Sequence, residues 1–311
     1  MNFLPMTANS PQIKLGLASR LVNGLLAIAP LANFAKGRAR NMMIKRAESI
    51  GVPWRENARK LSDRNWEEDL AIIANPDVQY PAYYTTSFHA YDEGNLNWKA
   101  AWEVESASRA VHAQIWSKGD VKGDPMLRQS YSRAIQTSIK NTPNKILDLG
   151  CGAGMSTFEL QDNYPTAEVT GIDLSPYFLA VAKYRGKQNN KNANWMHRAA
   201  ENTGLADSSF DLVSACLMFH ELPTSAAISI IKEAQRILRP GGYLAIMDMN
   251  PQSEIFLKMP PYILTLLKST EPYLDQYFAL DIEKIFSEQG FHSPSITANS
   301  PRHRSIVAQK V

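Results

Sequence analysis

ILDLGCGAG, the stretch from Ile146 to Gly154, is an apolar strand pattern that runs directly into three alternate glycines. The segment ILDL predicts a short strand covered on both faces of a sheet. The glycines allow the chain to turn sharply and leave its backbone bare, so that a ligand can lie against it. A helix pattern opens at Met155, and its free N–H groups would point into the same space. The stretch therefore predicts a strand, loop and helix that together bind a ligand.

A second strand pattern ends on Asp173, about 20 residues downstream of the loop. A carboxylate at that position can accept hydrogen bonds from both hydroxyls of a ribose, as it does in dinucleotide sites. A glycine triplet alone would be a weak signal. Combined with the second strand and its terminal acid, it predicts a nucleoside pocket.

The spacing of the glycines separates this loop from a dinucleotide site, which uses G-x-G-x-x-G. Here the pattern is G-x-G-x-G with Asp148 two positions before the first glycine, and it closely resembles motif I of class I S-adenosylmethionine (SAM) methyltransferases. The resemblance implies that the loop cradles the methionine part of SAM, and that S-adenosylhomocysteine is the product. It also implies that Asp148 helps to hold the ammonium group, directly or through water, and that Asp173 binds the ribose. The expected cofactor contacts on the loop and the strand ends are Gly150, Cys151, Gly152, Gly154, Leu174 and Leu217.

The resemblance extends over about residues 125–311, through segments 201–213 and 236–244, and is nearest to the ubiquinone- and menaquinone-biosynthesis-like branch of small-molecule methyltransferases. In this family an acidic residue followed by alanine commonly meets the adenine. Here Ala199 precedes Ala200, so the family's acid is missing. The base is then expected to contact the Ala200 backbone and Glu201.

Composition limits the possible functions. The chain has 311 residues, 44% hydrophobic and 20% charged, which suits a globular protein with a sizeable core, and its net charge of +3 gives no basic field for nucleic acid. The Asn/Asp-Pro-Pro-Tyr box of enzymes that methylate amino groups of adenine or glutamine is replaced by residues 219–223, FHELP. Nucleic acid is therefore not expected as a partner. Cys151 and Cys216 lack metal-ligand spacing, so we expect no metal, no disulfide and a reducing, cytoplasmic location.

The order of patterns predicts an α/β fold: a Rossmann-like seven-stranded sheet with helices on both faces, parallel except for a C-terminal antiparallel hairpin strand. We expect a mainly helical N-terminal extension and lid over residues 1–122 and a methyltransferase domain over 123–311, with a substrate-cover insert at about 251–280. The predicted helices are 125–140, 155–162, 176–188, 223–238 and 281–289, and the predicted strands are 145–149, 168–173, 194–198, 210–216, 242–248, 292–298 and 303–309.

The N-terminal stretch 21–35 is apolar and is followed by five cations before the first acid. It is too short to cross a bilayer. Residues 19–46 could lie in the plane of an anionic membrane as a peripheral contact. The alternative is a helix packed on the core with its basic flank in water. A signal peptide is discounted, because an enzyme that consumes SAM must stay where SAM is made.

Residues 80–98 contain six aromatic side chains and a histidine. Such a segment can form a lid whose rings line a pocket for a flat or lipophilic acceptor. It can equally be a satellite cluster that holds the N-terminal helices on the sheet, and both readings stay open.

His220 is the first candidate for a catalytic group. The sequence places it just past the carboxyl end of the fourth strand, where ligands bind in open α/β sheets. A histidine there could take a proton from a hydroxyl or an activated carbon. It could also be structural, with a hydrogen bond to Glu221 or to the backbone. His89 and Tyr91, from the aromatic segment, are second-tier candidates.

The apolar stretch 255–267 lies where the family varies its substrate cover. With the aromatic segment it indicates a small lipophilic or aromatic acceptor, methylated at oxygen or carbon by in-line displacement. Two alternatives stay open: a protein side chain as acceptor, or a catalytically silent SAM-binding regulatory or scaffold protein. The sequence does not determine the acceptor or the oligomeric state.

Overall fold

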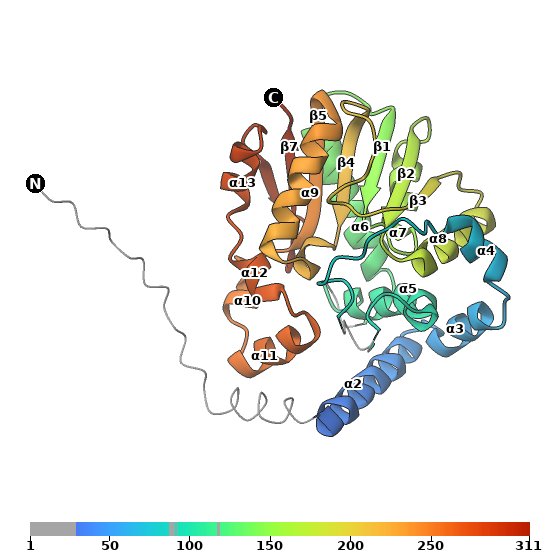
Figure 1. Cartoon of the computed structure of the whole chain (residues 1–311). Helices are drawn as coiled ribbons and strands as arrows, with labels where there is room; N and C mark the ends of the chain where they lie inside the picture. Colours follow the sequence, from blue (N-terminus) through green and yellow to red (C-terminus); the bar gives the residue numbers. More distant parts are fainter. Residues whose placement is uncertain (1–28, 87–90, 92, 117–118) are drawn as a thin grey trace, which may run out of the picture.

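The computed structural model describes residues 29–86, 91, 93–116 and 119–311. Within this part of the chain, one seven-stranded sheet has the order β3-β2-β1-β4-β5-β7-β6 (Figure 1). Only β7 runs against its neighbours, β5 and β6, and the other pairs are parallel. This confirms the predicted sheet. The strands are β1 (Lys145–Leu149), β2 (Glu168–Asp173), β3 (Asn194–His197), β4 (Phe210–Cys216), β5 (Leu238–Met249), β6 (Ser295–Ala298) and β7 (His303–Gln309).

Four strand boundaries differ from the prediction: β3 and β5 each end one residue away from the predicted position, and the starts of β5 and β6 differ by several residues. β5 begins at Leu238 and not at 242, because Leu238 pairs with Phe210 before an irregularity in the β4–β5 ladder. β6 begins at Ser295 and not at 292, directly after Pro294, which has no N–H to give to a ladder. The two shifted starts lie away from the carboxyl edge of the parallel strands and leave the site unchanged.

Helices cover both faces of the sheet (Figure 1). Ile146 packs with side chains of α6 (Gly123–Ser138) and α7 (Met155–Asn163) on one face. Its neighbour Leu147 packs with α9 (Thr224–Ile237) and α13 (Ile282–Glu288) on the other. Alternate residues of a strand point to opposite faces, so the wholly apolar pattern of β1 follows from burial on both sides.

The N-terminal region is mainly helical, as predicted, with α2 (Ala29–Ser49), α3 (Trp54–Ser62), α4 (Glu67–Ile73) and α5 (Trp98–His112). Helices α4 and α5 contact α8 (Pro176–Gln188), whose first turn is fixed by the Ser175 cap and by a proline at the start of the helix. α5 also contacts α6, and α2 packs on α5. These contacts place the extension beside the glycine loop.

Residues 251–280 form three short helices, α10 (Glu254–Leu257), α11 (Pro261–Thr270) and α12 (Leu274–Phe278). α10 and α11 stand off from the sheet, on the side to which α2 also extends (Figure 1). Tyr262, Ile263 and Leu266 of α11 are exposed although they are large and apolar.

The stretch 19–46 falls partly outside the described residues. In the described part of α2, Ile44 and Ala47 are buried while Arg38, Lys45 and Arg46 are exposed, as expected for a helix packed on the core with a basic flank in water. No helix in the described ranges is both long and apolar enough to span a bilayer. Contact with a membrane surface stays a prediction.

Candidate functional site

The glycine loop is shaped by backbone conformations that favour glycine. Gly150, Gly152 and Gly154 have φ values of 61°, 53° and 86°. A Cβ on Gly150 would lie 2.4 Å from the Met218 sulfur, so the neighbouring chain itself fills that space. A Cβ on Gly152 would meet nothing closer than Phe178, at 3.9 Å, and would stand in the cavity. Gly152 is therefore the position at which bare backbone leaves room for a ligand.

Asp173 lies at the end of β2 and faces the loop. Its carboxylate accepts hydrogen bonds from Gly152 N–H at 2.8 Å and from Ser175 N–H at 2.7 Å. The Tyr84 hydroxyl donates a third, at 3.3 Å. Burial raises the pKa of Asp173, and these hydrogen bonds partly offset that effect. The side chain expected to bind the ribose thus also fixes the loop.

Asp148 is fully buried beneath the loop and does not line the cavity. Its carboxylate accepts hydrogen bonds from the hydroxyls of Ser156 and Thr157, both at 2.7 Å. Burial raises its pKa to about 6. Because Ser156 does line the cavity, the path from Asp148 to a bound ammonium group leads through that hydroxyl or through water.

The expected adenine end lies between Ala200 and Glu201, which both line the cavity. Oε1 of Glu201 accepts a hydrogen bond from the Tyr83 hydroxyl. Oε2 is buried and has no hydrogen-bond partner among the described residues. A buried carboxylate oxygen without a partner is costly, so it suits a donor that a ligand brings.

Of the remaining expected contacts, Cys151, Leu174 and Leu217 also line the cavity, whereas Gly154 does not and packs against Trp195 and Phe158. Leu217 follows β4 with a φ of 58°, a conformation that costs a non-glycine residue about 1 kcal/mol or more. A hydrogen bond of 2.8 Å from the Leu217 N–H to the Met247 carbonyl stabilises this conformation. Strained residues of this kind cluster at functional sites.

The aromatic segment reaches over this end of the site. Besides the bonds of Tyr83 and Tyr84, the Tyr80 hydroxyl lies 3.2 Å from His197 Nε2, and its ring stacks on that of Tyr84. Tyr83 also packs against the core cluster of α9. The two interpretations of this segment are thus compatible. The signal in the sequence was the density of aromatic rings. It did not indicate that their hydroxyls contact Asp173 and Glu201, the two carboxylates expected to bind the cofactor.

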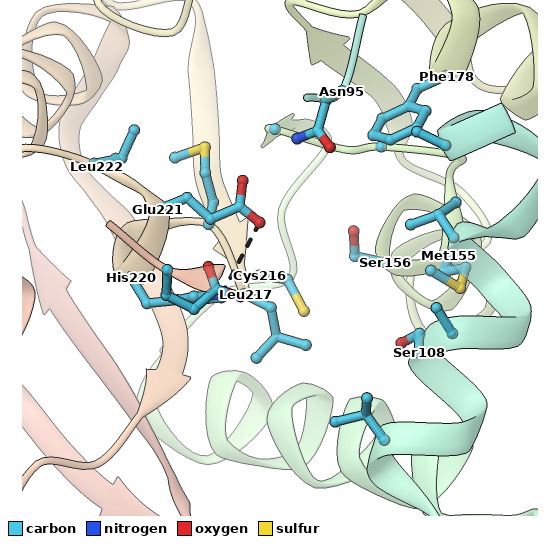
Figure 2. Close-up of a pocket in the computed structure, with 18 of the residues that line it drawn as sticks. Asn95, Ser108, Met155, Ser156, Phe178, Cys216, Leu217, His220, Glu221 and Leu222 are labelled. Carbon is cyan, nitrogen blue, oxygen red and sulfur yellow. Dashed lines mark ion pairs between the residues drawn. The ribbon is translucent and has the colours of Figure 1, made fainter. Parts of the chain in front are cut away.

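His220 lies just after β4, in a 3-10 turn (Phe219–Glu221), and its ring faces the cavity (Figure 2). Nδ1 lies 2.7 Å from Oδ1 of Asp248, near the end of β5, and the backbone N–H of His220 donates to Oδ2 at 3.1 Å. Nε2 is 4.0 Å from Glu221. Burial alone would lower the pKa of His220, but the Asp248 carboxylate raises it to about 10. Sequence reasoning missed Asp248, although an acid near a strand end was the available signal.

The second-tier candidates differ in position. Tyr91 lines the cavity near α5, and its hydroxyl donates to Glu103 at 2.6 Å. Glu103 also pairs with Arg40. The phenol is therefore hydrogen-bonded to a carboxylate that Arg40 also contacts. His89 lies outside the described residues.

One cavity of about 680 Å³ is lined by Gly152, Asp173, Glu201, Leu217, Tyr91 and His220. Figure 2 shows His220, Glu221 and Leu222 on one wall, with Ser108, Met155, Ser156 and Phe178 opposite. Its size falls within the usual range for small-molecule sites, about 300–1,000 Å³. No group of three His, Cys, Asp or Glu side chains among the described residues is arranged to hold a metal ion.

The sequence of this site matches known proteins. A family model described as "Methyltransferase domain" matches residues 146–242. A ubiquinone biosynthesis O-methyltransferase from Psychrobacter arcticus is 30% identical, over 54% of this chain and 67% of that protein. The chain belongs to the SAM-dependent methyltransferase family.

Two further likenesses agree with this membership. An uncharacterised methyltransferase from Synechocystis is 33% identical over 147 residues, or 47% of this chain and 66% of that protein. The structure of a candidate O-methyltransferase from Nostoc punctiforme has a TM-score of 0.53 at 18% identity, over 82% of this chain and 72% of that chain, which shows a shared fold. The chain spans between 53% and 72% of the length of the first three curated relatives.

We expect SAM binding to this methyltransferase to weaken as the pH falls through about 6, the raised pKa of Asp148. The ionised carboxylate attracts the SAM ammonium, and protonation removes that attraction, so affinity should fall roughly tenfold per pH unit below 6. Calorimetric titration between pH 5 and 8 measures the SAM affinity at each pH. The Asp148→Asn variant should bind weakly with no inflection near 6, and an unchanged inflection in that variant would assign it to another group.

We expect Tyr84→Phe to release SAM faster and to weaken its binding about five- to tenfold, because the change removes only the hydroxyl that donates to Asp173. Stopped-flow dissociation is the measurement. Thr85→Ala, an exposed position on the same turn, is the control and should bind like the parent methyltransferase. Equal dissociation rates for Tyr84→Phe and the parent would show that the hydroxyl does not hold the cofactor.

Proposed function

We propose that the protein transfers a methyl group from SAM to the oxygen or carbon of a small, lipophilic acceptor. The observation that carries the proposal is the single cavity that runs from the glycine loop past His220 into an apolar chamber. A donor at the loop and an acceptor in the chamber would share one space. Alignment and exclusion of water are the main tasks of a protein in such a displacement.

The residues present fit SAM. Gly152 leaves a cradle that a Cβ would fill, and Glu201 offers a buried oxygen without a partner. Asp173 faces the loop from the next strand. When bound there, SAM supplies an activated methyl group on a sulfonium centre. Leu217 and Met218, which line the cavity beside Gly150, are placed to orient that end of the site.

The chamber has apolar walls from two separate parts of the chain. The insert contributes side chains of α10 and α11 and the loop between them, and the N-terminal extension contributes side chains of α2 and α5. These are Phe256, Met259, Ile263 and Leu267 on one side and Met43, Val104, Ala107 and Val111 on the other. An apolar lining of this kind favours an apolar body in the acceptor. The name of the Psychrobacter relative, an O-methyltransferase, supports an oxygen as the atom methylated.

His220 stands where the two parts of the cavity meet. Asp248 fixes the ring through Nδ1, so Nε2 faces the cavity. A pKa of about 10 leaves the ring protonated at neutral pH, so Nε2–H can hydrogen-bond an anionic acceptor oxygen whose own proton has passed to water. Asp248 is the positioning residue, since its pKa is lowered despite burial by the His220 charge, and it remains ionised.

The test follows a labelled methyl group from SAM to either the protein or the solvent-extractable fraction. Full-length protein is incubated with methyl-labelled SAM and an apolar extract of the source cells, and the mixture is separated into protein and solvent-extractable fractions. Protein-dependent label in the solvent fraction, absent with Gly152→Val, supports the proposal. Label confined to the protein fraction would instead indicate a protein side chain as acceptor, and no transferred label would indicate a silent SAM-binding protein.

A further inference from the structure

The cavity is lined by four arginines, and three of them have partners within the protein. Arg40 pairs with Glu103, and Arg128 pairs with Asp124. Arg198 donates to the Thr203 carbonyl at 2.9 Å. These three guanidinium groups therefore already have ion-pair or hydrogen-bond partners within the protein.

Arg302 is the exception. Its side chain makes no ion pair and no hydrogen bond among the described residues, although it is half-buried. Burial lowers its pKa, which shows that the guanidinium is partly stripped of water without a compensating charge. A desolvated cation without a partner is costly, and an anion brought by a ligand would remove the cost.

Arg302 also lies at the corner of the sheet that holds His220. Its carbonyl accepts a hydrogen bond of 2.7 Å from Asn250 N–H, directly after β5. In the same ladder Met249 pairs with His303, and Asp248 is the residue that binds His220. An acceptor with its reacting oxygen at His220 would therefore have another part of its ring or chain close to Arg302.

The nearby titratable groups do not neutralise Arg302. Asp248 is engaged by His220, and Asp124 by Arg128 and His112. Burial raises the pKa of Glu221 to about 8 and that of Glu271 to about 7, so at neutral pH the first carboxyl is mostly protonated and the second about half protonated. His303, beside Arg302, has its pKa lowered to about 3 by burial and by the positive charges of His112 and Arg302. The corner is thus electropositive.

We propose that the acceptor is an amphiphile: an apolar body lies in the chamber between α11 and α5, and an acidic group, a carboxylate or a phosphate, pairs with Arg302. This inference rests on the proposed function and adds a substrate class to it. Arginine suits both anions because its planar fork can donate two parallel hydrogen bonds. The pair would also hold the reacting oxygen in register with His220.

The test uses dansyl-labelled undecanoic acid and its methyl ester, which share the apolar chain and differ in the charge. Fluorescence titration of the full chain, saturated with S-adenosylhomocysteine, should show the acid binding about tenfold more tightly than the ester. Arg302→Gln should abolish this preference and leave ester binding unchanged, and Arg302→Lys should keep part of it. Arg239→Gln, a charge removal at a residue that does not line the cavity, controls for net charge.

Competition distinguishes the two anions. If dodecyl phosphate displaces the labelled acid more effectively than undecanoic acid does, the acidic group is a phosphate, and the reverse order indicates a carboxylate. Dodecanol, which carries no charge, should displace the labelled acid poorly. Equal binding of acid and ester to the parent protein, or a preference retained in Arg302→Gln, would overturn the inference. The label-partition experiment tests the proposed function separately. A methyl-labelled product that stays in the organic solvent at high pH would be neutral, so it would contradict the acidic group on the acceptor but not methyl transfer itself.

Discussion

Asp173→Ala is expected to weaken SAM binding by at least about 100-fold, or roughly 2.7 kcal/mol. The carboxylate accepts hydrogen bonds from the loop at Gly152, from the start of α8 at Ser175, and from the lid at Tyr84. Its removal deletes the expected ribose acceptor and also frees the loop that shapes the rest of the site. Isothermal titration calorimetry is the direct measurement. Asp173→Asn keeps the size and one acceptor oxygen, so it should lie between the alanine variant and the parent.

Asp211→Ala is the matched control. Asp211 also accepts two backbone N–H bonds, from Asn144 and Lys145 at 2.9 Å each, but it does so at the opposite edge of the sheet. Its loss should lower stability and leave SAM affinity unchanged. If both aspartate variants bound SAM alike, Asp173 would have only a structural role and the assignment of the ribose end would be wrong.

Gly152→Val is expected to reduce SAM affinity by about 100-fold or more while the protein stays folded. The nearest atom to the new Cβ is 3.9 Å away, so the side chain does not collide with the protein and instead fills ligand space. The positive φ of 53° adds a backbone cost of about 1–2 kcal/mol. Calorimetry measures the affinity, and thermal unfolding checks the fold.

Gly241→Val separates strain from obstruction. Gly241 also has a positive φ, of 77°, and ordinary space around its Cβ, but it lies at an exposed position of β5 outside the cavity. It should show a similar loss of stability with normal SAM binding. A Gly152→Val protein that is folded and binds SAM normally would show that the cofactor does not lie against this loop.

Much of the sheet was predictable because its signals are local. β1, β2 and β4 match their predicted bounds, since short apolar runs bounded by loop residues specify buried strands. The loop was predictable for the same reason: alternate glycines with an acid two positions before them fix both the turn and its chemistry. In the less regular segments 80–98 and 251–280, the only available signal was amino-acid composition. Composition does not determine which residues a side chain contacts.

The distant partners in the site could not be read from the sequence. Tyr84 and Asp173 are joined by a hydrogen bond although they are 89 positions apart in the chain, and His220 and Asp248 are in contact although they are 28 positions apart. Arg302 was not singled out at all, because an arginine in a C-terminal hairpin has no local signature. Its significance follows from comparison with the other cavity arginines, and that comparison requires the fold.

The sequence by itself determined the sheet, the glycine loop and the acid at the end of β2, because strand period, glycine spacing and strand-end position act over a few neighbouring residues. Only the tertiary structure decided that Tyr83 and Tyr84 donate to Glu201 and Asp173, that Asp248 raises the pKa of His220, and that the Arg302 side chain has no partner among the described residues. These properties depend on burial and on distances of a few ångströms between residues far apart in the chain, and packing sets both.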